Sequence, residues 1–257
     1  MTVPMYTPED TNLIAEEFAT LGLKHASLVE AFSKREYRTE RACEYAVQGF
    51  NRRLFTLKEC IELFFETIPL NLEGIPTEKS RQIATIATQA FLINVFGCVD
   101  NLARVWVEER NVRDKNDQPL PDKWIGMGGR YSRVRASFSP DFRAYLDSLS
   151  EWFSGMEKFR DALAHRISPY FPPYVIDPED KPLHDSLGGE IVAAIRLQNF
   201  DRAAGLAKQQ EELRFFRPYI THSFSEKALL LPVHPQMLAD FNTIDEIARN
   251  LLLELAN

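Results

Sequence analysis

The sequence lacks most of the features that identify an enzyme at sight. Its 257 residues include three cysteines and 11 glycines, and they contain no H-E-x-x-H, Walker A or G-x-S-x-G motif. These absences argue against a zinc protease, a P-loop nucleotide-binding enzyme and a serine hydrolase. The low glycine content argues against a loop-rich sandwich and suits long helices. We expect no cofactor and no bound metal ion.

The sequence also lacks a long hydrophobic run. The longest apolar stretch, residues 90–99, is interrupted by Asn94, and residues 1–10 are acidic without an apolar segment. Neither pattern is typical of a membrane span or a signal peptide. The three cysteines show no C-x-x-C spacing, which favours reduced thiols in a protein core. We therefore expect a cytoplasmic protein that makes no contact with a membrane.

Hydrophobic periodicity predicts an all-α protein built as an antiparallel helical bundle. Thr7-Pro8 has the signature of a helix start, and a second helix with one apolar seam runs from Cys43 to Ile68. A third helix, residues 77–110, is apolar on almost all sides and should be the central one. The seam of the second helix could face a partner chain as readily as its own bundle.

A further helix carries the most distinctive residues of the chain. Ser139-Pro140 predicts its start, its apolar face continues to Leu163, and a proline after Ser168 predicts its end. We expect this helix to be continuous and to pack one face against the bundle.

The pattern becomes less regular after this helix. Residues 187–213 predict another helix, residues 214–233 contain short extended pieces consistent with a β-hairpin, and a last helix begins at His234. We therefore divide the chain into a helical bundle, residues 1–174, and a C-terminal helical extension packed on the bundle, residues 175–257.

One short stretch brings together groups with useful chemistry. Arg160, Asp161 and His165 place a guanidinium, a carboxylate and an imidazole within six positions of a helix. An imidazole transfers protons near neutral pH, and a guanidinium holds phosphoryl charge. Asp161 precedes His165 by four residues and can therefore orient its ring. The alternative is a purely structural role, in which the three residues form a charge network at a helix C-terminus, where the helix dipole favours cations.

This pattern resembles the motif of the HEPN superfamily, in which a polar residue follows an arginine and a histidine comes after four to six intervening positions. Arg217 and His222 repeat the spacing, but a proline follows Arg217 and the stretch is extended in character. The resemblance therefore rests on the first pair, and it covers roughly residues 7–174.

The resemblance implies a bacterial, metal-independent endoribonuclease of the kind found in toxin–antitoxin and phage-defence systems. Such a protein would act as a homodimer, with RNA as its substrate and a protein antitoxin or regulator as a further partner. His165 would serve as general acid and base at the ribose 2′-hydroxyl or the leaving oxygen. Arg160 would hold the scissile phosphate, and Asp161 would have an orienting role.

Basic residues elsewhere are secondary candidates for RNA binding. Arg130, Arg133 and Arg135 form the most basic stretch, and Arg166 directly follows the motif histidine. They could hold RNA phosphates, or they could be ordinary solvated surface. The net charge of −7 argues against general nucleic-acid binding but leaves room for a local site.

Three polar residues interrupt the central helix. Asn94, Asp100 and Asn101 lie among apolar residues, where an unpaired polar group costs about 1–3 kcal/mol. They form either a buried hydrogen-bond network or the lining of a site. A third hypothesis is that Asn94, Asn101 and Trp106 line a pocket for a small molecule.

A non-catalytic function remains the alternative to a ribonuclease. In this second hypothesis the chain is an all-helical module that binds protein or nucleic acid, and the motif only ends a helix. The apolar seam of residues 43–68 and the acidic surface would then recognise a partner.

Overall fold

The computed structural model describes residues 5–223, 225–226, 228 and 230–256. The regular secondary structure of the described chain is helical apart from two short antiparallel strand pairs, which confirms the all-α prediction. The elements in order are α1 (Pro8–Lys34), α2 (Glu40–Cys43), the π-helical η1 (Glu44–Phe50), α3 (Asn51–Thr67), α4 (Glu78–Arg110), the 3₁₀ turn η2 (Asp122–Trp124), α5 (Ser132–Ala136), α6 (Pro140–Ser148), α7 (Ser150–His165), β1 (Val175–Ile176), α8 (Lys181–Arg196), α9 (Phe200–Glu212), β2 (Arg214–Phe215), β3 (Tyr219–Ile220), β4 (Leu231–Pro232) and α10 (Val233–Ala256).

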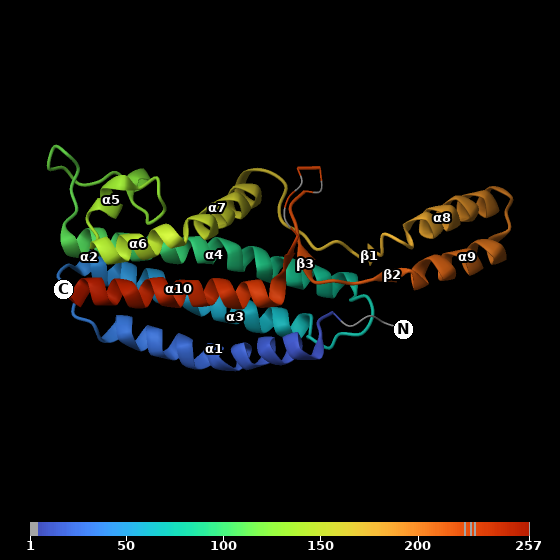
Figure 1. Cartoon of the computed structure of the whole chain (residues 1–257), viewed down its shortest axis with the longest axis horizontal. Helices are drawn as coiled ribbons and strands as arrows, with labels where there is room; N and C mark the ends of the chain where they lie inside the picture. Colours follow the sequence, from blue (N-terminus) through green and yellow to red (C-terminus); the bar gives the residue numbers. More distant parts are fainter. Residues whose placement is uncertain (1–4, 224, 227, 229, 257) are drawn as a thin grey trace.

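Long helices α1, α3, α4 and α10 lie side by side and form the bundle (Figure 1). The seam predicted for the second helix points into this bundle, because Leu54, Ile61 and Phe64 are fully buried. Burial of each such side chain contributes about 1.5–3 kcal/mol. The expectation that the seam could face a partner chain is therefore wrong, since its own bundle already covers it.

Helix α4 is the central helix, as its pattern predicted. Thr77 caps its first turn by accepting a hydrogen bond from the Ser80 amide, and Asn111 ends it in the left-handed conformation with φ 49°. By length and hydropathy α4 could cross a membrane, but half of its apolar window is buried inside the bundle. Burial by neighbouring helices accounts for the buried half of this window, whereas Ile86 and Ile93 are exposed.

The helix predicted from Ser139 to Ser168 is two helices. Ser139 caps α6 through the Phe142 amide, as expected, but the chain bends at Leu149 (φ −90°, ψ 11°) before α7 begins. The Leu149 amide donates to the Leu146 carbonyl three residues back, which is typical of a tightened last turn. The bend lets α6 pack on α10 while α7 packs on α4.

The C-terminal region divides differently from the expected boundary between residues 1–174 and 175–257. Helix α10 belongs to the bundle: Ile244 and Leu251 are fully buried, and it packs on α1, α3 and α4. The helix predicted over residues 187–213 is a pair, α8 and α9, separated at Gln198 (φ 56°). This pair extends away from the bundle (Figure 1) and is not packed on it.

Two strand pairs connect these parts. Strand β1 pairs with β2 at the base of the α8–α9 hairpin, which we call the arm, and β3 pairs with β4 just before α10. The second pair is the hairpin predicted within residues 214–233; positions 224, 227 and 229 of that stretch lie outside the described residues. The arm is thus inserted in the chain between α7 and the bundle helix α10.

The cysteines only partly match the expectation of core thiols. Cys60 and Cys98 are buried, and burial raises the pKa of the Cys60 thiol to about 11. Cys43 is exposed, because it lies on the outer side of the helix that begins at Glu40.

Candidate functional site

Arg160 is held in place on the outer side of α7. Its guanidinium lies 4.1 Å from the centre of the Phe96 ring on α4, a cation–π distance. Its Nε and Nη2 both donate to Asp161 Oδ1, at 3.0 and 2.6 Å, and Nη2 is 3.6 Å from Glu157 Oε1. The side chain remains 23% exposed, so the guanidinium is oriented but still reachable.

His165 is the last residue of α7 and is exposed. It makes no hydrogen bond or ion pair with the residues that the structure describes, whereas Asp161 is engaged by Arg160. The structure therefore brings Asp161 to the arginine and not to the imidazole, contrary to the role expected for it. The imidazole is left open to an external group.

The helix separates Arg160 from His165. Five positions along an α-helix correspond to about 7.5 Å along the axis and about 140° around it. Both residues lie within α7, which is regular up to His165. The two side chains consequently leave the helix in different directions and do not face one point in a single chain.

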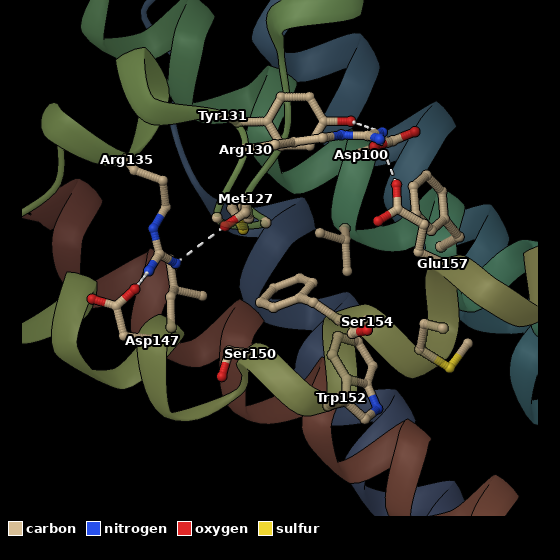
Figure 2. Close-up of a pocket in the computed structure, with 17 residues that line it drawn as sticks. Asp100, Met127, Arg130, Tyr131, Arg135, Asp147, Ser150, Trp152, Ser154 and Glu157 are labelled. Atoms are coloured by element: carbon tan, nitrogen blue, oxygen red, sulfur yellow. Dashed lines mark hydrogen bonds and ion pairs between the residues drawn. The ribbon is translucent and has the colours of Figure 1, made fainter.

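A cavity of about 240 Å³ lies beside Arg160, between α4, the segment 127–131 and the α6–α7 region. Its rim is charged (Figure 2): the guanidinium of Arg130 binds the Glu157 carboxylate and donates to the Tyr131 hydroxyl at 2.7 Å. Asp100 lines the same cavity. We call it the charged cavity.

Asp100, on the polar face expected for α4, interacts electrostatically with Arg160 of the motif. Burial raises the pKa of its carboxyl group, and four guanidinium groups act in the opposite direction, those of Arg104, Arg160, Arg53 and Arg130. Three of these arginines also pair with acids, Arg104 with Asp122, Arg130 with Glu157 and Arg160 with Asp161, so Asp100 lies in a network of paired charges between α4 and α7.

Asn94 and Asn101 belong to a partly buried hydrogen-bond network with Arg53. The guanidinium of Arg53 on α3 lies between them and donates from Nε to Asn101 Oδ1 and from Nη1 to Asn94 Oδ1, each at 3.0 Å. Trp106 is buried and donates from its indole nitrogen to Ser137 Oγ at 2.8 Å, so this nitrogen is engaged outside the Arg53 network.

Sequence reasoning missed Arg53, although a signal was present. Gly97 lies between the two asparagines on the central helix, and a side chain at this position would clash with the Arg53 guanidinium. A glycine inside an apolar helix, flanked by amides on the same face, indicates close approach of a polar group from a neighbouring element.

The basic stretch does not form one surface. Arg135 is only 8% exposed; it donates to the Met127 carbonyl and pairs with Asp147, so its role is structural. The prediction that Arg135 binds RNA is therefore wrong. Arg133 is exposed and donates to the Arg113 carbonyl at 2.9 Å, and Arg130 lies at the charged cavity.

Arg166 lies on the other side of α7. Its Nη1 is 3.3 Å from Glu226 Oε2, and the same oxygen is 3.5 Å from Nδ1 of the buried His222. The second arginine–histidine pair of the sequence thus places its histidine near the first motif, in a cleft that Lys158 also lines. This proximity was not predicted.

Within the described part of the chain, no group of three or more histidine, cysteine or acidic residues is arranged to hold a metal ion. No family model matches the chain, and no curated protein or solved structure matches it significantly. A function has to be inferred from the geometry of the site.

Proposed function

We propose that the protein is a metal-independent endoribonuclease of HEPN type, active in the cytoplasm as a homodimer. The observation that supports the proposal is the arrangement of Arg160, Asp161 and His165 in a single chain. Arg160 is oriented by Asp161 and Phe96, and His165 is exposed without a partner among the described residues. An oriented cation and an unengaged imidazole are the two groups that cleavage of RNA requires.

A second copy of the chain supplies what one copy lacks. Because Arg160 and His165 leave α7 about 140° apart, one phosphodiester is not reached by both from the same helix. Two copies related by a two-fold axis place the arginine of each beside the histidine of the other. The charged cavity, with Arg130 on its rim, then lies next to the RNA backbone.

The reaction follows from the groups at this composite site. A histidine accepts the proton of the ribose 2′-hydroxyl, and the 2′-oxygen attacks the adjacent phosphorus. The bond from phosphorus to the 5′-oxygen breaks, and that oxygen receives a proton from the second histidine. Arg160 neutralises the charge that develops on the phosphoryl oxygens. The products are a 2′,3′-cyclic phosphate and a 5′-hydroxyl end.

RNA cleavage in the presence of EDTA tests the proposal. Wild type should cut an RNA oligonucleotide but not DNA of the same sequence, and His165→Ala and Arg160→Ala should each lose cutting while keeping the helical content. Arg196→Ala, at an exposed arginine on α8, is the matched control. Cleavage that continues in His165→Ala would exclude this mechanism. An antitoxin or regulator, if present, would silence the wild type, so purified protein is required.

A second candidate function is protein binding, and the arm favours it. Large apolar side chains are exposed along α8 and α9, with Leu197 at 78% and Phe200 at 66%. Such residues on a projecting hairpin are typical of an interaction surface. The other members of this set are Leu183, Val192 and Ile195. If no RNA is cut, and if a double Leu197→Ser and Phe200→Ser variant loses a partner that wild type retains, the non-catalytic hypothesis is preferred.

A further inference from the structure

A second cavity lies on the inner side of α7 and has a different chemistry. It has a volume of about 190 Å³ and is enclosed by α4, α7, the β3–β4 pair and α10. Its walls are mostly hydrophobic, and we call it the apolar cavity. The hydrophobic residues that line it are Phe91, Leu92, Trp152, Met156, Phe159, Ile220, Leu231, Val233 and Met237.

One carboxylate is built into this wall. Asp240 of α10 is 1% exposed and lines the cavity. Its Oδ1 accepts hydrogen bonds from the Trp152 indole nitrogen at 2.8 Å and from Gln236 Nε2 at 2.9 Å. No described residue donates to Oδ2, so half of the carboxylate lacks a partner. A buried charge without a counter-ion is unfavourable, and its retention points to a function.

The other charged residue at this cavity has the same sign. Glu151 lines it, and none of the lining residues is a lysine, arginine or histidine. Burial raises the pKa of Asp240 to about 6, while the two hydrogen bonds oppose the increase, so the group is mostly ionised at neutral pH. The site therefore complements a positive charge and not an anion.

We propose that the apolar cavity binds a small organic cation, a protonated primary amine on an apolar body, through an ammonium group that donates to Asp240 Oδ2. The apolar body lies against Phe91 and Phe159, where ring faces also attract the cation. A cavity of about 150 Å³ accepts benzene, so 190 Å³ holds one ring and a short alkyl chain. This ligand class is separate from the RNA proposed for the outer side of α7.

Trp152 provides an optical readout of binding. Its ring lines the charged cavity as well as the apolar one, and its nitrogen is directed away from the labelled charged residues of Figure 2 toward Asp240. An ammonium group at Asp240 changes the field at this indole. Binding should therefore alter tryptophan fluorescence at the same concentrations that titration calorimetry reports.

The experiment compares benzylamine with its neutral counterpart benzyl alcohol, at pH 7.5, by titration calorimetry of the whole chain. We expect wild type to bind the amine at least tenfold more tightly than the alcohol. Asp240→Asn should remove this preference, since the amide still accepts both hydrogen bonds but carries no charge. Asp245→Asn, five residues further along α10 and outside the cavity, should leave the preference intact.

Each result that contradicts these expectations overturns the proposal. Equal affinity for amine and alcohol, undetectable binding of both, or amine selectivity that survives Asp240→Asn would do so. If Asp240→Asn fails to fold, wild type alone decides. Asp240 on α10 and Glu151 on α7 are the titratable groups of the lining, and α4, β3 and β4 contribute none. Lowering the pH from 7.5 to 4.5 should weaken amine binding at least tenfold and leave alcohol binding unchanged.

Discussion

Two neighbouring cavities share Trp152 and Met156 of α7 as a common wall, yet only the charged cavity has basic residues, Arg130 and Arg135, in its lining. In the charged cavity, the carboxyl group of Asp100 is partly buried, and the charges of four arginines lower its pKa against the effect of burial. In the apolar cavity, Asp240 has only two neutral hydrogen-bond donors. Burial raises the pKa of both carboxyl groups, but only one of them has cations near it.

The difference shows that burial alone does not decide what a carboxylate does. Where arginines lie near it, as at Asp100, the carboxylate belongs to a network of paired charges, and we propose that Arg160 of this network binds RNA. Where neutral donors hold one oxygen, the other oxygen is open to a cation. Four predictions test whether the two sides of α7 are independent.

The largest expected effect is on RNA cleavage. Arg160→Ala should reduce the cleavage rate about 100-fold or more, because the charge that stabilises the phosphoryl oxygens is removed. Benzylamine binding should not change, since Arg160 does not line the apolar cavity. Rates from single-turnover assays and affinities from calorimetry give the two values. Loss of both activities would show that the two sides are coupled.

The second prediction concerns the pH dependence of stability. The folded pKa of Asp240, about 6, lies above the ordinary value of 3.8, so folding favours its protonated form. Its charge therefore lowers stability as the pH rises from about 4 to above 6. Asp240→Asn should be more stable than wild type by up to about 3 kcal/mol at pH 8, from two pKa units at 1.36 kcal/mol each.

Urea unfolding at pH 8 and pH 4 measures this difference. The advantage of Asp240→Asn should fall below about 1 kcal/mol at pH 4, where the wild-type carboxyl is protonated in the folded state and about half protonated in the unfolded state. A variant that is less stable than wild type at pH 8 would show that the carboxylate has a counter-ion after all. Binding sites typically retain buried charged groups that lower the stability of the fold.

The third prediction tests the packing of Arg53 against Gly97 of α4. Gly97→Ala should displace the Arg53 guanidinium and weaken its hydrogen bonds to Asn94 and Asn101. We expect a net loss of about 1 kcal/mol, because overpacking exceeds the helix propensity gained by alanine. Gly22→Ala on α1, where a side chain would meet open space, should instead be neutral or stabilising. Thermal unfolding compares the two; equal effects would mean that Arg53 is easily displaced.

The smallest expected effect is in the arm, which lies outside both cavities. Leu197→Ser with Phe200→Ser should change the unfolding free energy by less than about 0.5 kcal/mol, since both side chains are exposed. RNA cleavage and benzylamine binding should be unaffected. Chemical denaturation provides the first value, and the assays above provide the others. A large loss of stability would place these side chains against the bundle.

The sequence predicted the bundle well where local signals were strong. Thr7 and Ser139 cap helices as expected, and the burial of α4 follows from its apolar composition. The bend at Leu149 was missed because the apolar spacing continues across it. The position of α10 was missed because its partners α1 and α3 are distant in sequence.

The site was predictable only in part, for a related reason. The residues of the motif were evident, but the pairing of Asp161 with Arg160 depends on side-chain directions on one helix. Arg53 and Asp240 become important only through contacts between helices. For Asp240, the available signal was an acid that lies three residues after Met237 and four before Ile244, within the apolar spacing of α10.

The β1–β2 pair holds together the two ends of the arm where the arm joins the rest of the chain. Val175 faces Phe215 across β1 and β2, so the chain leaves and returns at nearly the same place. For the stability of the bundle, the arm is therefore equivalent to a loop that connects α7 to α10. Doubling the length of such a loop costs only about 0.6 kcal/mol in closure entropy. An insertion point of this kind tolerates arms of different length or sequence, so the surface that the arm presents can diversify without altering the helices that hold the two cavities.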